Sequence, residues 1–213
     1  MTFALLPVKD PAQAKQRLST AFSAVQREQL ARAMFQDVLA QVMLVRGLDR
    51  VVVVSSDAEV LRQAEAAGGT PLAEESQSGH SQSADEAAQR CMEWGATSLL
   101  LVPSDVPSVQ AAEMERMLDA AALLPAPSLV IVPDTAGTGT NAMVRTPPNL
   151  IESRFGPGSF RAHVDQAEAK RARVVVGRPP GLVFDLDTPE DVRLLFERDP
   201  HGKITSLLRR QLA

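Results

Sequence analysis

The amino-acid sequence predicts a single α/β domain in which helices cover both faces of a mostly parallel sheet. Short continuous apolar runs, such as Val51–Val54, have the composition of strands that are buried on both faces. Amphipathic stretches alternate with these runs, and such an alternation is typical of a parallel sheet. The chain has 213 residues, without an internal repeat or a linker, so we expect one domain over residues 1–213.

Six segments are predicted as strands because each is a short apolar run. A strand that is covered on both faces needs no alternation of polar and apolar residues, so runs of valine and leucine are sufficient. In chain order the predicted strands are Phe3–Val8, Val51–Val54, Ser98–Val102, Leu129–Val132, Arg173–Val176 and Val183–Leu186.

Helices are predicted between these strands from apolar spacing and from capping residues. Leucine, methionine and valine recur at helical spacing over roughly residues 23–46, which indicates a long helix with one buried stripe. Capping boxes predict two further helix starts, at Ser56-x-x-Glu59 and at Ser83-x-x-Glu86. Glycines that follow both stretches are expected to end these two helices.

Composition excludes several classes of protein. A net charge of −4 and few aromatic residues argue against a nucleic-acid partner. No apolar run approaches the roughly 20 residues that span a bilayer, and the N-terminal stretch is too short and too poorly flanked for a signal peptide. The single cysteine, Cys91, excludes an intrachain disulfide. We therefore expect a cytoplasmic protein that binds neither nucleic acid nor membrane.

Acidic residues at two predicted strand ends indicate a metal site, because ligands of open α/β sheets bind outside the carboxyl ends of the strands. Asp105 follows one strand, and Asp185 and Asp187 stand one residue apart at another, where an extended backbone points both carboxylates to one face. These like charges repel each other unless a cation lies between them. Since Mg²⁺ prefers carboxylates and substrate phosphates, we predict that the three aspartates bind magnesium.

Capping is the competing explanation for these acids. An aspartate before a helix often caps it, and this would account for Asp105 taken alone. Asp187 or Thr188 would likewise cap the helix that Pro189 opens at its first position. Asp185 is not explained in this way, because it lies within a predicted apolar strand.

Two glycine-rich segments are predicted to hold an anionic group. Pro133–Asn141 alternates glycine and threonine, which suggests accessible backbone N–H groups and hydroxyls. Arg154–Phe160 has two glycines before Ser159, the expected N-cap of the helix that carries His163, and a helix N-terminus attracts anions. A flexible hairpin loop and a plain helix entry are the respective alternatives.

Lys9, Lys15 and Arg17 follow the first predicted strand and complete the candidate site. Together they can neutralise a triphosphate and its departing pyrophosphate. Lysine and arginine on a loop are usually only solvated, so this interpretation depends on the other motifs. No catalytic nucleophile is indicated, because the histidines are scattered and Cys91 lies within a predicted helix.

With these motifs in order, the chain resembles the phospholactate/phosphoenolpyruvate guanylyltransferases of deazaflavin coenzyme F(420) biosynthesis. The resemblance covers almost the whole chain and depends most on the segments Gly137–Asn141 and Arg154–Phe160. Its other motifs are Leu6–Lys9, Ala14–Leu18, Val51–Ser55, Pro103–Pro107 and Asp185–Asp191.

The resemblance implies a nucleotide-diphospho-sugar transferase fold of the GT-A type. It implies transfer of GMP from GTP to 2-phospholactate, phosphoenolpyruvate or 3-phosphoglycerate, with release of pyrophosphate and with Mg²⁺ as cofactor. The three aspartates would bind the metal, the three cations would assist catalysis, and four residues would bind the acceptor. These four are Thr140, Asn141, Gly156 and Ser159.

One segment departs from the family's usual pattern. A Gly-Leu-Asn-like stretch is expected before the central helix, and this chain has Gly79–Glu86 there, near the expected place of the nucleotide base. Two other functions remain open: a nucleotidyltransferase of the same fold that acts on a sugar phosphate or a molybdenum cofactor, and a non-catalytic nucleotide-binding protein. A homodimer, and hand-over of the product to the downstream transferase of the pathway, are the hypotheses for protein partners.

Overall fold

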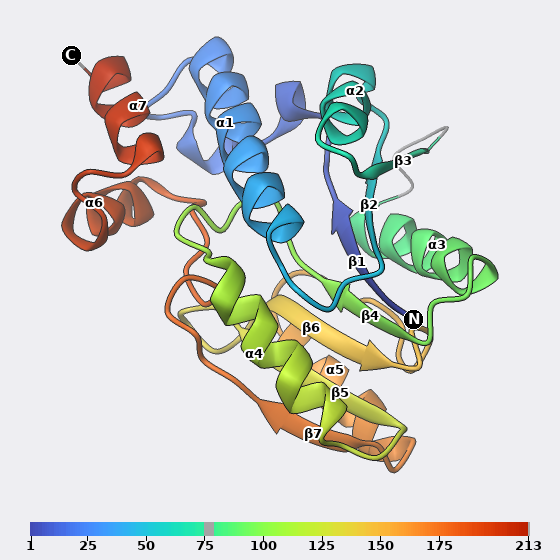
Figure 1. Ribbon diagram of the computed structural model, residues 1–213. Coiled ribbons are helices and arrows are strands. Elements are labelled where there is room, and N and C mark those ends of the chain that lie inside the picture. Colours follow the sequence, from blue (N-terminus) through green and yellow to red (C-terminus); the bar gives the residue numbers. More distant parts are fainter. Residues whose placement is uncertain (75–78, 213) are drawn as a thin grey trace.

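The computed structural model describes residues 1–74 and 79–212, and it confirms the predicted α/β class. In this part of the chain a seven-stranded sheet has the order β3-β2-β1-β4-β6-β5-β7. Figure 1 shows the sheet crossing the molecule from β3 at the upper right to β7 at the bottom. Every strand pairs in parallel with its neighbours except β6, which is antiparallel to both β4 and β5.

Five of the six predicted strands are confirmed to within one residue at each end. The strands are β1 (Thr2–Pro7), β2 (Arg50–Ser55), β3 (Thr70–Ala73), β4 (Ser98–Leu101), β5 (Ser128–Pro133), β6 (Thr140–Thr146) and β7 (Arg173–Val176). Strands β3 and β6 were not predicted from the sequence. The second omission matters for the site, because β6 begins inside the segment that was interpreted as a glycine-threonine loop.

The predicted strand at Val183–Leu186 is wrong. These residues belong to no strand of the described sheet, although Phe184 and Leu186 are buried. Their side chains lie in a hydrophobic cluster with residues of α1, α6 and α7. The apolar pattern therefore reported burial correctly, but it was mistaken for a strand that pairs with neighbours.

The helices are α1 (Ala24–Met43), α2 (Ala58–Ala66), α3 (His80–Glu93), α4 (Ala111–Ala122), α5 (Ser159–Ala169), α6 (Pro189–Arg198) and α7 (Lys203–Leu212). Two short 3-10 turns, η1 (Pro11–Gln13) and η2 (Gln16–Leu18), follow β1. The long first helix is confirmed, with Ser23 as its N-cap. Thr188 is confirmed as the cap of α6, with Pro189 in the first helical position.

Three of the predicted helix caps are corrected by the structure. Asp57, rather than Ser56, caps α2 and accepts a hydrogen bond from the N–H of Val60. Helix α3 begins at His80 after Gly79, three residues before the predicted cap at Ser83. The N-cap of α5 is Gly158 rather than Ser159. Its φ of 77° lies in the left-handed region, which favours glycine.

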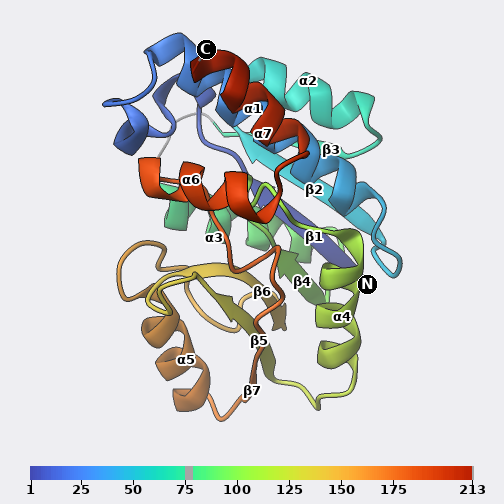
Figure 2. The same ribbon diagram turned by 90° about the vertical axis from the view of Figure 1, so that its left-hand side faces the viewer.

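The sheet lies between two helical layers. Helices α1, α2 and α4 share one hydrophobic core with one face of the sheet, and α3 and α5 share another core with the opposite face. Figure 2 shows α4 and α5 on opposite sides of the sheet. Along β1 the side chains alternate as a pleated strand requires: Ala4 and Leu6 enter the first core, and Phe3 and Leu5 the second.

A third cluster packs the C-terminal segment against α1 and the turn that precedes it. It joins Leu18, Phe22 and one end of α1 to the apolar sides of α6 and α7, and it buries Phe184 and Leu186. These two residues alternate with Asp185 and Asp187 in the chain. Burial of the apolar pair therefore fixes the backbone that carries the two acids.

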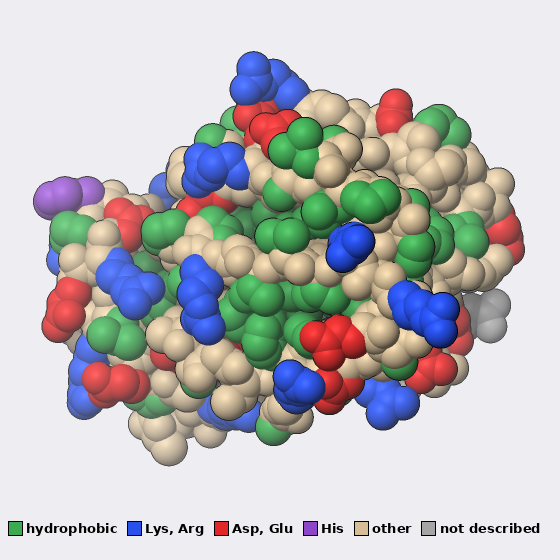
Figure 3. All heavy atoms as spheres, turned by 90° about the horizontal axis from the view of Figure 1, so that it is seen from below, with side chains coloured by type: hydrophobic (Ala, Val, Ile, Leu, Met, Phe, Trp, Pro, Cys, Tyr) green, Lys and Arg blue, Asp and Glu red, His purple; other side chains and the backbone are tan. Residues whose placement is uncertain are grey.

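Strand β7 forms the outer edge of the described sheet. Two of its valines, Val175 and Val176, are 38% and 48% exposed. Figure 3 shows the molecule from below, and hydrophobic side chains gather on the surface that it presents. None of the helices in residues 1–74 and 79–212 combines the length and the apolar composition that crossing a bilayer requires.

Candidate active site

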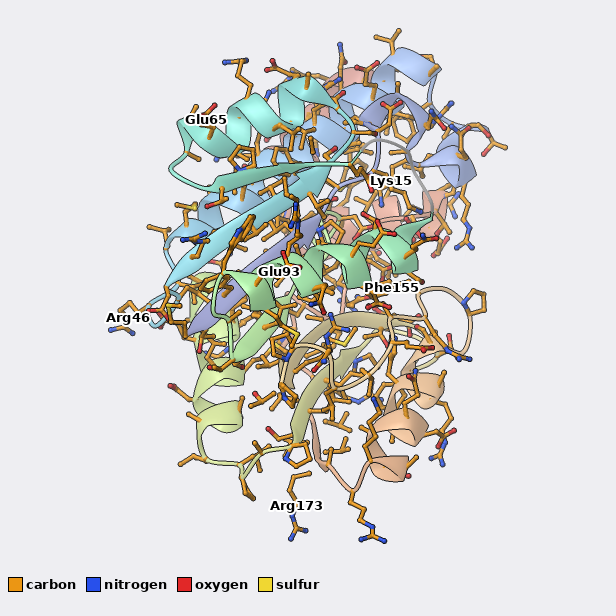
Figure 4. All side chains as sticks on the ribbon, turned by 90° about the vertical axis from the view of Figure 1, so that its right-hand side faces the viewer. Lys15, Arg46, Glu65, Glu93, Phe155 and Arg173 are labelled. Carbon is orange, nitrogen blue, oxygen red and sulfur yellow. The ribbon has the colours of Figure 1, made fainter. Side chains whose placement is uncertain are left out.

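A cavity of about 540 Å³ opens at the carboxyl ends of β1 and β4. Because β6 runs antiparallel to its neighbours, its first residues lie at this same edge. Figure 4 shows Lys15 and Phe155 at this end of the sheet and Arg46 at the opposite end. All ten residues predicted for the site line the cavity: Lys9, Lys15, Arg17, Asp105, Thr140, Asn141, Gly156, Ser159, Asp185 and Asp187.

The ammonium of Lys15 bridges two of the predicted metal ligands. Its Nζ lies 2.8 Å from Asp105 Oδ2 and 2.8 Å from Asp187 Oδ1, and only 6% of its side chain is exposed. Burial acts to lower the pKa of Lys15, but the two carboxylates outweigh that effect and raise the pKa above its usual value. Lys15 is therefore a charged part of the site rather than a solvated loop residue.

Arg17 and Lys9 lie at the rim of the cavity. The Arg17 guanidinium is 3.7 Å from Asp187 Oδ2, and 70% of its side chain is exposed. Lys9 is likewise exposed while lining the cavity. Both side chains are placed where they can meet an anion that enters from solvent, and a surface pair of this kind contributes little to stability.

Asp185 is a half-buried acid of the cavity wall. Burial, followed by the negative charge of Asp105, raises the pKa of its carboxyl group to about 6. The amide of Asn141 donates to Asp185 Oδ1 at 3.3 Å and to the carbonyl of Leu182 at 3.0 Å. Because both contacts engage this amide within the protein, we expect Asn141 to position Asp185 as well as to line the acceptor site.

The capping alternative does not describe the acids in the structure. Helix α4 has Gln110 as its N-cap, so Asp105 does not cap it. Thr188 caps α6, and the N–H groups of Asp187 and Thr188 donate to the carboxylate of Asp191. In addition, the N–H of Leu186 donates to the carbonyl of Asp105, which brings the two acidic segments together.

The donors at this edge suit a hard divalent cation. Among the described residues, no group of three or more His, Cys, Asp or Glu side chains is arranged so that it could hold a metal ion. Magnesium, however, commonly takes one or two carboxylates and completes its shell with waters and substrate phosphates. Lys15 already places a positive charge between Asp105 and Asp187, so the arrangement of these acids is compatible with a cation.

The glycine-threonine segment is organised differently from its sequence interpretation. The N–H groups of Thr138 and Gly139 donate to the carboxylate of Asp134, at 2.9 and 2.8 Å. They are therefore not available to a bound anion. A Cβ at Gly139 would lie 2.5 Å from Asp134 Oδ2, so a larger residue there would displace this carboxylate.

Two backbone N–H groups at the N-terminus of α5 also donate to carbonyl groups within the protein. The N–H of Ser159 donates to the carbonyl of Gly156, and the N–H of Phe160 donates to the carbonyl of Thr138, both at 3.1 Å. The hydroxyl of Ser159, by contrast, is buried and has no hydrogen-bond partner among the described residues. This hydroxyl, more than the first helical N–H groups, is what α5 offers to a ligand.

The sequence analysis missed two buried residues that support the cavity wall. His163 is fully buried on α5, with Nδ1 2.9 Å from Thr140 Oγ1 and Nε2 accepting from the N–H of Arg154 at 2.8 Å. Its position four residues after Ser159, on the same side of a helix, was a usable signal. Arg145 was not identifiable, because a charged residue in an apolar strand gives no indication of its partner.

Arg145 and Asp85 hold the loop that precedes α5. The guanidinium of Arg145 donates to the carbonyl of Ile151 at 3.0 Å and lies 3.3 Å from Asp85 Oδ1. Asp85 in turn accepts from the N–H and the hydroxyl of Ser153. These contacts join α3, β6 and the loop, and they give Asp85 a structural role.

A second cavity, of about 300 Å³, adjoins the first. The two cavities share Lys9 among the residues that line them, and Gly79 and Ser83 line only the second. The segment Gly79–Glu86, which departs from the family pattern, therefore contributes to a cavity next to the main one. Residues 75–78 lie outside the described part of the chain.

Comparison with known proteins finds similar sequences over nearly the whole chain. Residues 2–210 match the family model described as "Guanylyl transferase CofC like". A phosphoenolpyruvate guanylyltransferase of Rubrobacter xylanophilus is 38% identical over 91% of this chain and 92% of its own. A 2-phospho-L-lactate guanylyltransferase of Methanothermobacter thermautotrophicus is 34% identical over 90% of this chain and 82% of its own.

A solved structure supports the fold. A putative nucleotide-diphospho-sugar transferase from Desulfovibrio desulfuricans superposes with a TM-score of 0.79, covering 98% of this chain and 94% of its own. At 18% identity this similarity concerns the fold alone. The expected nucleotide-diphospho-sugar transferase type of fold is thereby confirmed.

Proposed function

The chain belongs to the CofC-like guanylyl transferase family, and on that premise we propose that it transfers GMP from GTP to a small phosphorylated acid and releases pyrophosphate. The observation that carries the proposal is the convergence of acids, cations and hydroxyls from separate segments on one cavity. The acids and Lys15 suit a triphosphate with its metal, and the hydroxyls of Thr140 and Ser159 suit a second anion beside it.

The proposed reaction is an in-line displacement at the α-phosphorus of GTP. A phosphate oxygen of the acceptor forms a bond to that phosphorus. The bond from the phosphorus to the oxygen that bridges to the β-phosphate breaks, and pyrophosphate leaves with the bonding electrons. The attacking oxygen is already anionic at neutral pH, so no general base is required. Catalysis then consists of positioning and charge neutralisation.

We assign the metal-binding role to Asp105, Asp185 and Asp187. Magnesium, when bound, neutralises phosphate charge and helps to bring two anions together. Lys15 would remain beside these acids and contact the triphosphate. Lys9 and Arg17, exposed at the rim, would neutralise the charge that develops on the leaving pyrophosphate.

We assign acceptor binding to the wall formed by β6 and α5. Thr140 opens β6, and Ser159 supplies a buried hydroxyl that has no partner among the described residues. Gly156, with a φ of 119°, shapes the loop between them and has space where a side chain would stand. We place the nucleobase in the adjoining cavity, next to Gly79 and Ser83.

The proposed biological setting follows from the family. The product would enter the biosynthesis of deazaflavin coenzyme F(420), and the reaction would take place in the cytoplasm. Phosphoenolpyruvate is the first acceptor to test, because the 38% identical relative is named for it. 2-Phospholactate and 3-phosphoglycerate are the other two.

Mass spectrometry of the products tests the proposal directly. The protein is incubated with GTP, Mg²⁺ and each of the three acids, with matched reactions that contain ATP, CTP or UTP or that contain EDTA. We expect a guanylylated acid and pyrophosphate only where GTP and Mg²⁺ are both present. A preference for another nucleotide would indicate a different nucleotidyltransferase, and GTP binding without turnover would indicate a non-catalytic nucleotide-binding protein.

A further inference from the structure

We propose that His163 is a positioning residue that fixes the hydroxyl of Thr140 as a hydrogen-bond donor toward the bound acceptor. The nature of that acceptor rests on the proposed function. The hydrogen-bond pattern around the histidine ring does not, because it follows from contacts within the protein.

The hydrogen bond from Arg154 identifies the nitrogen of the His163 ring that carries the proton. The backbone N–H of Arg154 points to His163 Nε2 at a distance of 2.8 Å. A backbone N–H can only donate, so Nε2 must accept and cannot carry a proton of its own. A neutral imidazole has one N–H, and it must therefore be on Nδ1.

The ring stays neutral because its surroundings disfavour a second proton. His163 is fully buried, and burial, followed by the positive charge of Arg145, lowers its pKa to about 4. Arg154 acts in the same direction, and the carboxylate of Asp85 acts against them. At neutral pH the residue is thus a fixed Nδ1–H tautomer.

The hydrogen bond between His163 and Thr140 determines the direction of the threonine hydroxyl. His163 Nδ1 lies 2.9 Å from Thr140 Oγ1. Since the ring donates, the threonine oxygen accepts, and the hydroxyl's own proton must point elsewhere. Thr140 lines the main cavity, and no second hydrogen-bond partner for its hydroxyl is present in residues 1–74 and 79–212. The hydroxyl is therefore available to donate to an anion in the cavity.

The His163 ring also contacts the loop before α5. Through Nε2 the same ring holds the backbone of Arg154, and the ring of Phe155 meets it edge-on, with 5.7 Å between centroids. Phe155 and Gly156 line the cavity just beyond this point. One imidazole thus sets both the direction of the Thr140 hydroxyl and the position of the loop that faces it.

Substitutions separate this role from general support of the fold. In His163→Gln the side-chain oxygen can still accept from Arg154, while the amide N–H groups, which share one terminal carbon with that oxygen, are displaced from the position at which Nδ1 meets Thr140. Thr140→Val removes the hydroxyl at nearly constant shape, and Thr140→Ser keeps it. The matched control is Gln166→Ala, because Gln166 ties the same loop to the same helix through the backbone of Glu152 without contacting Thr140.

Steady-state kinetics with phosphoenolpyruvate and GTP is the main measurement. Loss of a hydrogen bond to a charged group should raise the KM for the acceptor about tenfold to a hundredfold in His163→Gln and in Thr140→Val, and leave the KM for GTP within about twofold. The double variant should be no worse than Thr140→Val, because the histidine acts through the hydroxyl. Gln166→Ala should stay close to the wild type, and Thr140→Ser should recover most of the acceptor affinity that Thr140→Val loses.

The proposal is overturned if the two single effects multiply in the double variant, or if folded His163→Gln keeps its acceptor KM. A long-range ¹H–¹⁵N spectrum of the wild type decides the tautomer even if the His163 variant does not fold, and the chain has only three histidines to assign. We expect the proton of His163 on Nδ1 at neutral pH, and a proton on Nε2 would refute the proposal.

If the proposed function is wrong, the experiments give a different set of results. In that case the wild type makes no guanylylated product with any of the three acids, and the inference is judged on calorimetric binding of phosphoenolpyruvate together with the spectrum. Weaker binding to Thr140→Val and to His163→Gln, with an Nδ1–H ring, supports it. Equal binding to all three proteins contradicts it.

Discussion

The ammonium of Lys15 lies 2.8 Å from Asp187 Oδ1, although 172 positions separate the two residues in the chain. The same ammonium is 2.8 Å from Asp105 Oδ2. The loop after β1 and the segment before α6 therefore meet above the end of β4. The repulsion of Asp185 and Asp187 led us to expect a cation between or beside them, and in the protein the ammonium of Lys15 lies between Asp105 and Asp187.

Replacement of Asp187 by Asn should abolish turnover without unfolding the protein. The neutral amide weakens the metal site and the contact with Lys15, while the pair of Lys15 with Asp105 remains. We expect pyrophosphate release to fall by at least about a hundredfold. Asp37→Asn is the matched control, because Asp37 pairs with Lys203 and does not line the cavity. Near-normal release in Asp187→Asn would remove this residue from the catalytic site.

Replacement of Lys15 by Met should make magnesium a stabiliser of the fold. Without the ammonium, Asp105 and Asp187 repel each other. We expect a loss on the order of 2 kcal/mol, less than for a fully buried pair because the two acids are 31% and 36% exposed. Magnesium should then raise the thermal unfolding midpoint more in the variant than in the wild type. An equal shift in both proteins would contradict a cation site between these acids.

The buried, neutral His163 should make stability depend on pH. Its pKa is lowered to about 4 in the folded protein, so the unfolded chain takes up a proton first as the pH falls. The contribution is complete above about pH 6.5 and is lost progressively toward pH 4, with at most about 2 kcal/mol lost between pH 7 and pH 5.

The measurement for His163 is urea unfolding at the two pH values. Asp185 contributes with the opposite sign, because burial raises its pKa to about 6, so the comparison must be between the wild type and His163→Gln. The decrease in the free energy of unfolding from pH 7 to pH 5 should be smaller in the variant. Identical decreases would show that His163 is not buried in its neutral form.

The pair of Arg145 and Asp85 should respond unequally to removal of either partner. Asp85→Ala leaves a fully buried guanidinium without its counter-charge and frees Ser153, so we expect a loss of about 2–3 kcal/mol. Arg145→Met should cost less, because burial already lowers the pKa of Arg145 and its Nε and Nη2 have no partner among the described residues. Chemical denaturation of both variants tests this order, which equal losses would refute.

The order of strands and helices could be predicted because the local pattern of apolar residues indicates which side chains are buried. Val51–Val54 and Leu129–Val132 are strands of the central sheet as expected, and Thr188 caps α6 as expected. The same local signal failed at Val183–Leu186. An apolar run reports that side chains are buried, but it does not say whether the backbone has a neighbouring strand to bond to.

Sequence by itself determined the family, the fold class and ten of the residues that line the cavity, because the chemistry of a charged substrate requires particular side chains at strand ends. Only the tertiary structure decided how those residues are held. The Lys15 ammonium between two acids, the Asn141 amide on Asp185 and the His163 ring on Thr140 each join segments that are distant in the chain. Such partners depend on the register of strands and on the packing of helices, and no local pattern specifies them.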